Sequence, residues 1–293
     1  MTGGPILLLG AGGQIGFELR RSLAPLGSIA APTHADLDLC DKTAIARIVN
    51  SLKPKLIVNA AAFTDVDGAE ANEGRHLAMA VNGEAPGLLA EAAARTRVPL
   101  VHYSTDYVFD GAATRPYRED DGPAPINAYG RSKLAGDERI AKSDAPHLIF
   151  RTSWIYARRR RNFLRTVQRL AMEQDELRVV SDQIGAPTWA RMVAEATAAV
   201  LGRCWRNGAG DPLSGCGGLY HMAAAGETSW HGFAQAIVAA GGKQIPVRAV
   251  TSAEFPRPAK RPAYSALDSG KLARVFEVTL PDWRDQLALC LAE

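Results

Sequence analysis

The stretch Ile6-Leu7-Leu8-Leu9-Gly10-Ala11-Gly12-Gly13-Gln14-Ile15-Gly16, near the start of the 293-residue chain, decides the fold. Its unbroken apolar run is typical of a buried parallel strand, and a helical pattern over residues 14–25 follows. Glycines at 10, 13 and 16 permit a tight turn, backbone approach to a pyrophosphate and close helix–strand packing, whereas a plain strand-to-helix turn needs only one or two glycines. The free N–H groups of the helix then favour phosphate. We therefore expect a dinucleotide-binding unit.

The rest of the first half repeats this alternation of strand and helix. Apolar runs at 56–58, 100–103 and 148–150 alternate with helical patterns over 77–95 and 128–142. This alternation is typical of buried parallel strands with helical crossovers. The sequence therefore predicts an α/β fold with a Rossmann-type doubly wound parallel sheet.

The alternation of apolar runs and helical patterns ends after about residue 155, where a block of arginines is followed by Gly-rich and Pro-rich stretches. We expect residues 1–155 to form the dinucleotide-binding Rossmann domain, which also receives elements from 177–220. Residues 156–293 are expected to form mainly a smaller α/β substrate-binding domain.

Composition excludes several classes of protein. The 34 Lys and Arg minus 31 Asp and Glu give a net charge of +3, and 47% of residues are hydrophobic, which are ordinary globular values. A pI of 8.7 is too mild to indicate a nucleic-acid partner. No apolar stretch of about 18 residues suggests a membrane span, and no signal peptide is recognisable. Four scattered cysteines indicate reduced thiols and a cytoplasmic protein.

The segment after the second expected strand bears on coenzyme choice. Residues 29–31 run into Pro32-Thr33-His34, without the acidic residue that usually binds a ribose 2′-hydroxyl. Because no carboxylate repels a 2′-phosphate, we expect NADPH, with NADH as the alternative. Asp38 is a candidate for binding the adenine amine or, equally, for capping the helix that begins near Thr43.

A second signal is the pair Tyr129 and Lys133. Residues four apart on a helix share one face, and a lysine cation lowers the pKa of a neighbouring phenol, so that Tyr129 can exchange a proton with a substrate oxygen. Ser104-Thr105-Asp106-Tyr107 follows an expected strand at its carboxyl end, where α/β ligands bind. A hydroxyl donor, an acidic tyrosine and a lysine beside a nicotinamide indicate a carbonyl reductase.

At these residues the chain resembles the extended short-chain dehydrogenase/reductases, and within them the dTDP-4-dehydrorhamnose reductase family. The resemblance covers essentially the whole chain. The matching stretches are Ser104–Gly111, Asn127–Gly130, Lys133–Asp137, Phe150–Tyr156, Asp182–Thr188, Arg261–Pro262, Leu267 and Leu280–Trp283.

The resemblance implies reduction of the 4-keto group of dTDP-4-dehydro-L-rhamnose to dTDP-L-rhamnose, the last step in making that sugar donor. The implied catalytic residues are Thr105, Tyr129 and Lys133. The expected coenzyme-binding residues are Gly10, Gly13, Gln14, Ile15, Gly16, Asp38, Leu39, Ala62, Phe63 and Thr64, with Tyr129 and Lys133. The expected substrate contacts are Ser104, Thr105, Asp106 and Trp154, the last of which is alternatively a core aromatic.

The resemblance also admits a homodimer and Mg²⁺ at a dimer contact built from C-terminal acids. Because Leu287 to Glu293 offers only Glu293, no metal site is expected. Arg158–Arg161 replaces a Gly-containing loop of the family and is either a clamp for the substrate diphosphate or a solvated face. Lys260–Arg261 is a second candidate for binding phosphate. Residues 206–218 are interpreted as an insertion.

Two other functions stay open at this stage. A nucleotide-sugar epimerase or dehydratase on the same fold would keep NAD tightly bound and need no added reductant. A non-catalytic regulatory subunit of the methionine adenosyltransferase type belongs to the same branch. The intact Thr105, Tyr129 and Lys133 argue against the regulatory subunit, because a binding module need not keep them.

Overall fold

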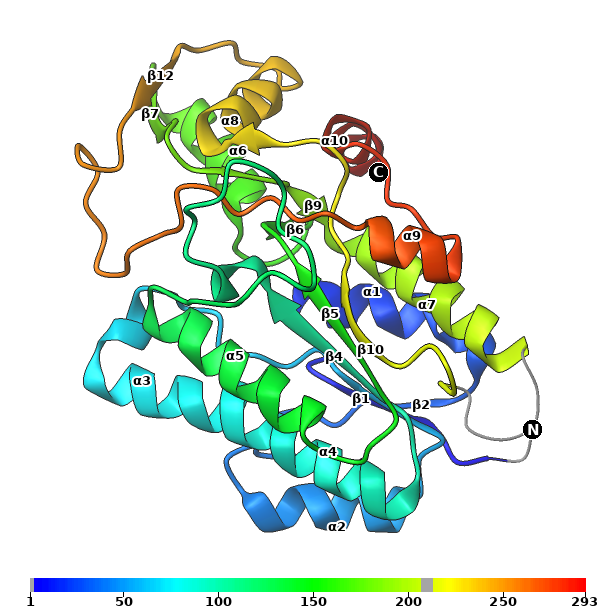
Figure 1. The fold of residues 1–293 in the computed structure, drawn as a ribbon. Coiled ribbons are helices and arrows are strands. Elements are labelled where there is room, and N and C mark those ends of the chain that lie inside the picture. The colour runs from blue at the N-terminus through cyan, green and yellow to red at the C-terminus, as the bar shows by residue number, and fades with distance from the viewer. Residues whose placement is uncertain (1–2, 207–212) are drawn as a thin grey trace.

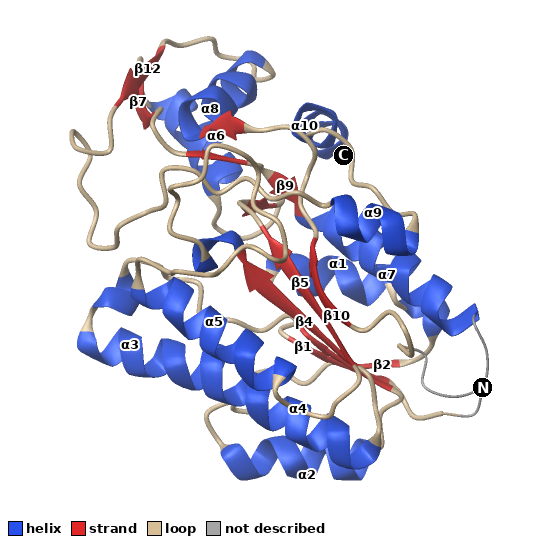
Figure 2. Cartoon of the chain, viewed as in Figure 1, coloured by secondary structure: helices blue, strands red, loops and turns tan. Residues whose placement is uncertain are grey.

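Six parallel strands form the central sheet of the computed structural model, which describes residues 3–206 and 213–293. Their order across the sheet is β10-β5-β4-β3-β1-β2 (Figure 2). The strands are β1 (Ile6–Leu9), β2 (Ile29–Ala30), β3 (Leu56–Asn59), β4 (Leu100–Thr105), β5 (His147–Thr152) and β10 (Gly218–His221). Every residue of β1, β3 and β4 is buried, as expected of strands covered on both faces. The predicted doubly wound parallel sheet is confirmed.

Helices cover both faces of this sheet (Figure 1). One face carries α2 (Lys42–Leu52), α4 (Ala85–Thr96) and α5 (Ala128–Ala141), and the other carries α1 (Gln14–Ser22), α7 (Ala190–Arg206) and α9 (Gly270–Phe276). Side chains of β1 alternate between the two resulting cores: Ile6 and Leu8 pack in one, Leu7 and Leu9 in the other.

The helical pattern over 77–95 is not one regular helix. α3 (Asn72–Ala78) passes into α4 through a π-helical turn at Met79–Glu84. Pro86, at the start of α4, lacks an N–H and would crowd the preceding turn of an α-helix, and the widened turn accommodates it. The same turn brings Asn82 into the interior, where it is fully buried.

The second half of the chain builds a smaller lobe around its own core. Its helices are α6 (Phe163–Glu173), α8 (Trp230–Ala239) and α10 (Trp283–Ala292). Its strands pair as β6 (Ile155–Tyr156) with β9 (Thr188–Trp189), β7 (Leu177–Val180) with β12 (Val247–Val250), and β8 (Ile184–Gly185) with β11 (Thr228–Ser229). Short 3₁₀ helices are Ala24–Leu26, Gly68–Glu70 and Asp106–Val108. Between these elements the chain returns to the first lobe as α7, β10 and α9. The domain boundary near residue 155 stays a prediction.

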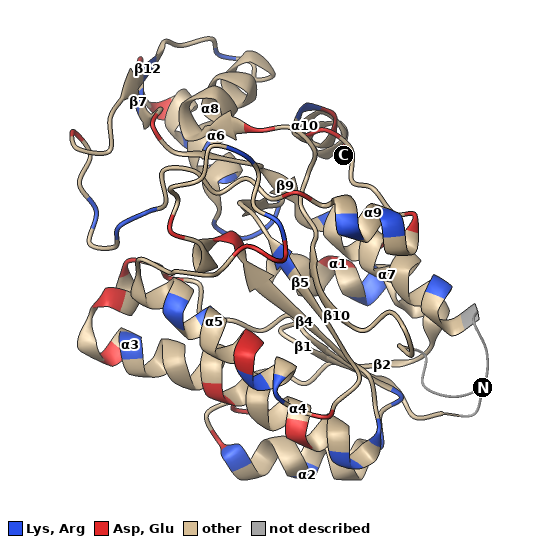
Figure 3. Ribbon diagram, in the orientation of Figure 1, with Lys and Arg blue, Asp and Glu red and all other residues tan. Residues whose placement is uncertain are grey.

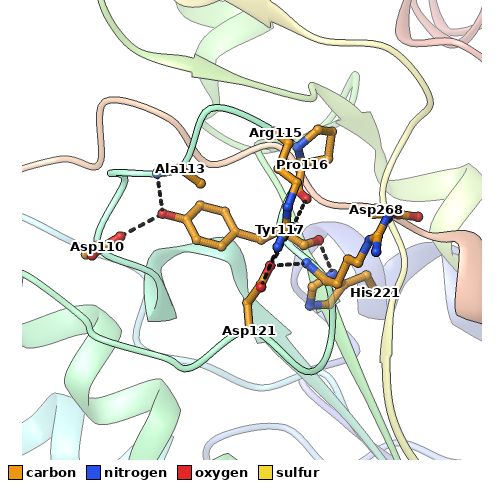
Figure 4. Close-up of polar contacts among 9 residues, drawn as sticks. Asp110, Ala113, Arg115, Pro116, Tyr117, Asp121, His221 and Asp268 are labelled. Atoms are coloured by element: carbon orange, nitrogen blue, oxygen red, sulfur yellow. Dashed lines mark hydrogen bonds and ion pairs between the residues drawn. The ribbon is translucent and has the colours of Figure 1, made fainter.

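A loop after the Asp106–Val108 turn is pinned between the lobes (Figure 4). The Tyr117 hydroxyl donates to Asp110 Oδ1 at 2.7 Å and accepts from Ala113 N at 3.2 Å. His221 Nδ1, on β10, lies 2.9 Å from the Tyr117 carbonyl oxygen. Burial lowers the pKa of His221 to about 3, so its ring is neutral. Arg115 holds the far end of the loop through a two-pronged contact with Asp121.

Charges of both signs are interspersed over the outer helices (Figure 3). Among residues 3–206 and 213–293, no helix is both long and apolar enough to cross a bilayer. The expected insertion at 206–218 falls partly on 207–212, which lie outside the described residues. Immediately after them, Leu213 is buried in the main core.

Candidate active site

The strand order reverses between β1 and β3, and two connected clefts open there at the carboxyl ends of the strands. The first, of about 850 Å³, extends over the end of β2; the second, of about 830 Å³, extends over β4 and α5. Both are lined by Gly10, Gly12, Gly13, Ala61 and Ala62. An extended ligand lying over the glycine loop can therefore reach both.

The glycines of this loop are required by its geometry. Gly10 adopts a φ of +75°, and a Cβ there would collide with the backbone of Ala60 and Ala61. A Cβ on Gly16 would collide with the Gly10 carbonyl, so helix α1 can approach the strand this closely only with glycine. Gly13 N donates to Gly10 O at 2.8 Å and closes the turn. The loop and the start of α1 thus fit a dinucleotide pyrophosphate.

Most of the expected coenzyme residues line the clefts. Gln14, Ile15 and Thr64 line the second cleft, and Asp38 and Leu39 line the first. Gly16 and Phe63 are the exceptions, because neither lines a cleft. The Phe63 side chain packs beside the Ala69, Ala78 and Ala128 cluster, and its backbone is hydrogen-bonded to Asn82.

The alternative role of Asp38 as a helix cap is wrong. Asp38 Oδ1 accepts from Cys40 N at 2.9 Å, whereas Asp41 is the N-cap of α2. Asp41 Oδ1 accepts from the backbone N–H groups of Thr43 and Ala44 at 2.9 and 3.1 Å. Asp38 therefore stays exposed in the cleft, beside the coenzyme loop.

The structure brings the three expected catalytic residues to one cleft: Thr105 ends β4, Tyr129 lies in the first turn of α5, and Lys133 lies one turn later. Asn127 caps α5 by accepting from Gly130 N at 2.7 Å. A Cβ on Gly130 would collide with the Tyr107 carbonyl oxygen. This glycine therefore lets the start of α5, and with it Tyr129, approach the end of β4.

Lys133 is buried and held from two sides. Its Nζ donates to the Tyr103 carbonyl oxygen at 2.6 Å and lies 3.3 Å from His102 Nε2. His102 Nδ1 is in turn 3.1 Å from Asn59 Nδ2. Burial lowers the pKa of Lys133 to about 8, opposed by the nearby Asp137. His102 is a fully buried strand residue, and its ring contacts the Lys133 Nζ.

Tyr129 holds its proton firmly. Loss of surrounding water raises the pKa of its phenol, the negative charges of Asp106 and Asp137 raise it further, and a hydrogen bond with Thr105 opposes them. The expectation that Lys133 lowers this pKa is not met in the structure, because the pKa is raised and Lys133 is not among the groups that shift it. At neutral pH Tyr129 is therefore a proton donor.

Ser104 and Asp106 line the second cleft, yet their polar groups are satisfied inside the protein. Ser104 Oγ donates to Asp137 Oδ2 at 2.9 Å. Asp106 accepts from Thr105 Oγ1 at 3.1 Å and from Ser153 Oγ at 3.0 Å, and Ser265 also hydrogen-bonds to it. Burial raises the pKa of Asp106 to about 6. Their direct contacts with substrate stay predictions.

Trp154 forms one wall of the second cleft with a partner that the sequence did not reveal. Its ring stacks on Trp230 at a centroid distance of 3.5 Å and an interplanar angle of 3°. Trp154 has a φ of +47°, and a Cβ on Gly185 would collide with its ring. Trp230 begins α8, far away in sequence. Trp154 is both a core aromatic and part of the cleft wall, since it is 9% exposed and lines the cleft.

Comparison with known proteins agrees with this geometry. The family model described as RmlD substrate binding domain matches residues 4–293. A dTDP-4-dehydrorhamnose reductase from Burkholderia thailandensis is 47% identical over 98% of both chains. The chain belongs to the dTDP-4-dehydrorhamnose reductase family.

Solved members of the family have the same fold. A dTDP-4-dehydrorhamnose reductase from Clostridium acetobutylicum gives a TM-score of 0.90 at 35% identity and covers 98% of both chains. Another, from Bacillus anthracis and solved in complex with NADP, gives a TM-score of 0.90 at 32% identity and covers 99% of both chains. The family and fold expected from the sequence are confirmed.

Arg261, part of the second phosphate candidate, forms an ion pair inside the protein. Arg261 Nη2 lies 2.9 Å from Asp67 Oδ2, and Arg261 Nη1 lies 2.5 Å from Asp67 Oδ1. Arg261 hydrogen bonds lower the pKa of Asp67. The arginine therefore ties the Pro-rich segment to the first lobe, and its role as a phosphate clamp is not supported.

The described part of the chain shows no cluster of metal-binding side chains. Residues 3–206 and 213–293 contain no group of three His, Cys, Asp or Glu side chains arranged to hold a metal. Glu293, the acid considered for a metal contact, forms an ion pair with Arg191. We do not assign a metal to this family member.

Proposed function

We propose that the chain is an NAD(P)H-dependent dTDP-4-dehydrorhamnose reductase that converts dTDP-4-dehydro-L-rhamnose to dTDP-L-rhamnose and prefers NADPH. One observation carries the proposal: Thr105, Tyr129 and Lys133 meet in a cleft continuous with the glycine-loop cleft. The near full-length likeness to dTDP-4-dehydrorhamnose reductases supports the substrate. The four cysteines, scattered along the sequence without C-x-x-C spacing, support a cytoplasmic enzyme.

The mechanism follows from which groups hold protons. Bound NAD(P)H supplies the hydride for C4 of the sugar. Tyr129, protonated at neutral pH, gives its proton to the C4 oxygen as negative charge develops there. Thr105 supplies a second hydroxyl at the end of β4; by turning its proton from Asp106 Oδ1 to the C4 oxygen it stabilises charge that appears only in the transition state.

Lys133 acts mainly by position. Its ammonium, held by the Tyr103 carbonyl oxygen, lies one helical turn from Tyr129 and lines the same cleft. From there it can donate hydrogen bonds to the coenzyme ribose. The stacked Trp154 and Trp230 supply an apolar wall that excludes water beside the deoxysugar.

The preference for NADPH is supported by the cleft over β2. Among its lining residues, those that directly follow β2 carry no carboxylate: they are Ala31, Pro32, Thr33 and His34. Asp38, which also lines this cleft, lies further along the chain. Three arginines, Arg20, Arg159 and Arg160, line the same cleft and favour a further phosphate.

The test is loss of reduced-nicotinamide absorbance with dTDP-4-dehydro-L-rhamnose generated in situ, run separately with NADPH and NADH. We expect oxidation of coenzyme in step with dTDP-L-rhamnose formation, faster with NADPH at equal low concentration. Absence of turnover with either coenzyme in folded protein would contradict the proposal. Tightly bound nicotinamide on isolation, with no need for added reductant, would favour an epimerase instead.

A further inference from the structure

The four consecutive arginines lie in one exposed loop, residues 157–162, between β6 and α6, which we call the arginine loop. Their surroundings differ. Arg159 lines the cleft over β2, Arg160 lines both clefts, and Arg161 lines only the cleft over α5. Arg158 lines neither. The run is therefore not a uniform charged face.

The arginine loop is fixed against the glycine loop by side-chain contacts. Arg160 Nε donates to the Gly12 carbonyl oxygen at 2.8 Å. Asn162 Nδ2 donates to Gln14 Oε1 at 2.8 Å, while Asn162 Oδ1 caps α6 by accepting from Arg165 N at 3.1 Å. One residue thus joins the end of the loop to the start of both α1 and α6.

Arg159 is held in a way that leaves its hydrogen-bonding edge available. Its guanidinium carbon lies 3.7 Å from the centroid of the Phe17 ring, on α1. Stacking engages the face of a guanidinium and leaves its N–H groups in the plane for an anion. Arg20 lies three residues after Phe17, on the same side of α1, and lines the same cleft.

These two arginines stand beside the end of β2, where Ala31 and Thr33 line the cleft. The acid in this cleft, Asp38, already accepts a hydrogen bond from Cys40 N at 2.9 Å. In a parallel α/β sheet the adenosine ribose lies at the end of the second strand, over the glycine loop. A phosphate on its 2′-hydroxyl would face Arg20 and Arg159.

We propose that Arg159, with Arg20, binds the 2′-phosphate of NADPH, so that the arginine loop of the second half of the chain selects the coenzyme. This rests on the NADPH preference in the proposed function. The segment directly after β2 holds no arginine of its own, and the loop supplies the guanidinium from across the cleft. Arg160, at the junction of the clefts, faces the part of the coenzyme common to NADPH and NADH.

The test is a binding measurement by titration calorimetry at fixed ionic strength. The ligands are NADP⁺, NAD⁺ and the fragment pair 2′,5′-ADP and 5′-ADP, and the variants are Arg159→Ala, Arg159→Lys and Arg158→Ala. Loss of a charge-assisted, two-pronged phosphate contact weakens binding by about 10- to 100-fold. We expect this loss for Arg159→Ala with NADP⁺ and 2′,5′-ADP, and less than about a twofold change with NAD⁺ and 5′-ADP.

The other variants sharpen the result. Arg159→Lys keeps the charge but not the flat stack, and should recover only part of the lost affinity. Arg158→Ala removes the same charge from the same loop and should leave all four ligands unchanged. Equal weakening of NADP⁺ and NAD⁺ in Arg159→Ala, or no weakening of either, would overturn the proposal.

The outcome is separable from that of the proposed function. If the wild-type protein forms dTDP-L-rhamnose but Arg159→Ala discriminates between NADP⁺ and NAD⁺ as the wild type does, the arginine assignment fails and the reductase stands. If the wild type binds NADP⁺ through Arg159 but forms no dTDP-L-rhamnose, the coenzyme site stands and the substrate assignment fails.

Discussion

The glycine loop and the catalytic face of α5 line the same cleft but are held in place differently. The loop from Gly10 to Gly16 owes its shape to Gly10 and Gly16, where a Cβ would collide with neighbouring backbone. Tyr129 and Lys133 owe their positions and proton affinities to side chains contributed by other strands and loops. His102 and Asp106 come from β4 and the turn that follows it, and Asn59 comes from β3.

This difference separates two kinds of sensitivity. Change in the glycine loop should act through local strain and coenzyme affinity. Change on the α5 side, other than at the ribose-binding Lys133, should act through proton transfer, pH dependence and sugar binding, with the coenzyme still bound. The following experiments test that separation.

The largest effect is expected for Tyr129→Phe, which removes the proton donor and leaves the ring. We expect kcat to fall by roughly 10²- to 10⁴-fold, because general acid catalysis contributes about that much. The Kd for NADPH, measured by calorimetry, should change little. A variant with wild-type kcat would contradict the role of Tyr129, and a large loss of coenzyme affinity would contradict the separation of the two regions.

Gly10→Ala tests the other region. At a φ of +75°, with the backbone of Ala60 and Ala61 in the way, the added methyl strains the loop. We expect a loss of about 3 kcal/mol in the free energy of unfolding by urea and weaker binding of both NADPH and NADH. Gly122→Ala is the control, because a Cβ there meets nothing within 4 Å. Equal stability of the two variants would show that the loop can adapt.

Asp106 provides a pH test of the buried network. Burial raises its pKa from 3.8 to about 6, so the folded protein binds this proton more tightly than the unfolded chain. The stabilisation is complete below the unfolded pKa and is lost as the pH rises through the folded one. Relative to Asp106→Asn, the wild type should lose up to about 3 kcal/mol between pH 4 and 7.

Urea unfolding of both proteins across this range makes the comparison. Ser153→Ala removes one donor to the carboxylate, so it should raise the pKa of Asp106 further and steepen the loss. Parallel stability curves for the wild type and Asp106→Asn would refute the pKa assignment.

The smallest effect is expected for Trp230→Ala, which removes the partner of the Trp154 ring. An aromatic pair contributes about 0.5–1.5 kcal/mol, so KM for the sugar nucleotide should rise by about 10-fold or less. Kd for NADPH should be unchanged. A higher Kd for the coenzyme, with an unchanged KM for the sugar nucleotide, would contradict the placement of the two tryptophans beside the sugar.

Sequence alone predicted the features that depend on local rules. Strands such as β1 and β4 are recognisable as apolar runs because both of their faces are buried. The glycine pattern is recognisable because a Cβ at Gly10 or Gly16 would collide with backbone close by in the fold. The helical pattern over 77–95 concealed a π turn, since Pro86 displaces hydrogen bonds that periodicity does not record.

Partnerships between distant segments could not be predicted. Neither Trp230 nor Asn82 carries a motif, and their contacts with Trp154 and Phe63 arise only when the chain folds. Arg261 looked like a phosphate ligand because its partner, Asp67, lies almost two hundred residues earlier. The expected effect of Lys133 on the pKa of Tyr129 failed because burial, which the sequence spacing does not show, raises this pKa.

The most direct test of the central claim is isotope transfer. The wild-type protein is incubated with dTDP-4-dehydro-L-rhamnose and NADPH carrying deuterium at the reactive carbon of the nicotinamide, and the product is examined by mass spectrometry and NMR. We predict dTDP-L-rhamnose with one deuterium at C4 and an equal amount of NADP⁺, both suppressed in Tyr129→Phe. Conversion of the sugar nucleotide without deuterium at C4 and without oxidation of NADPH would contradict the reductase assignment.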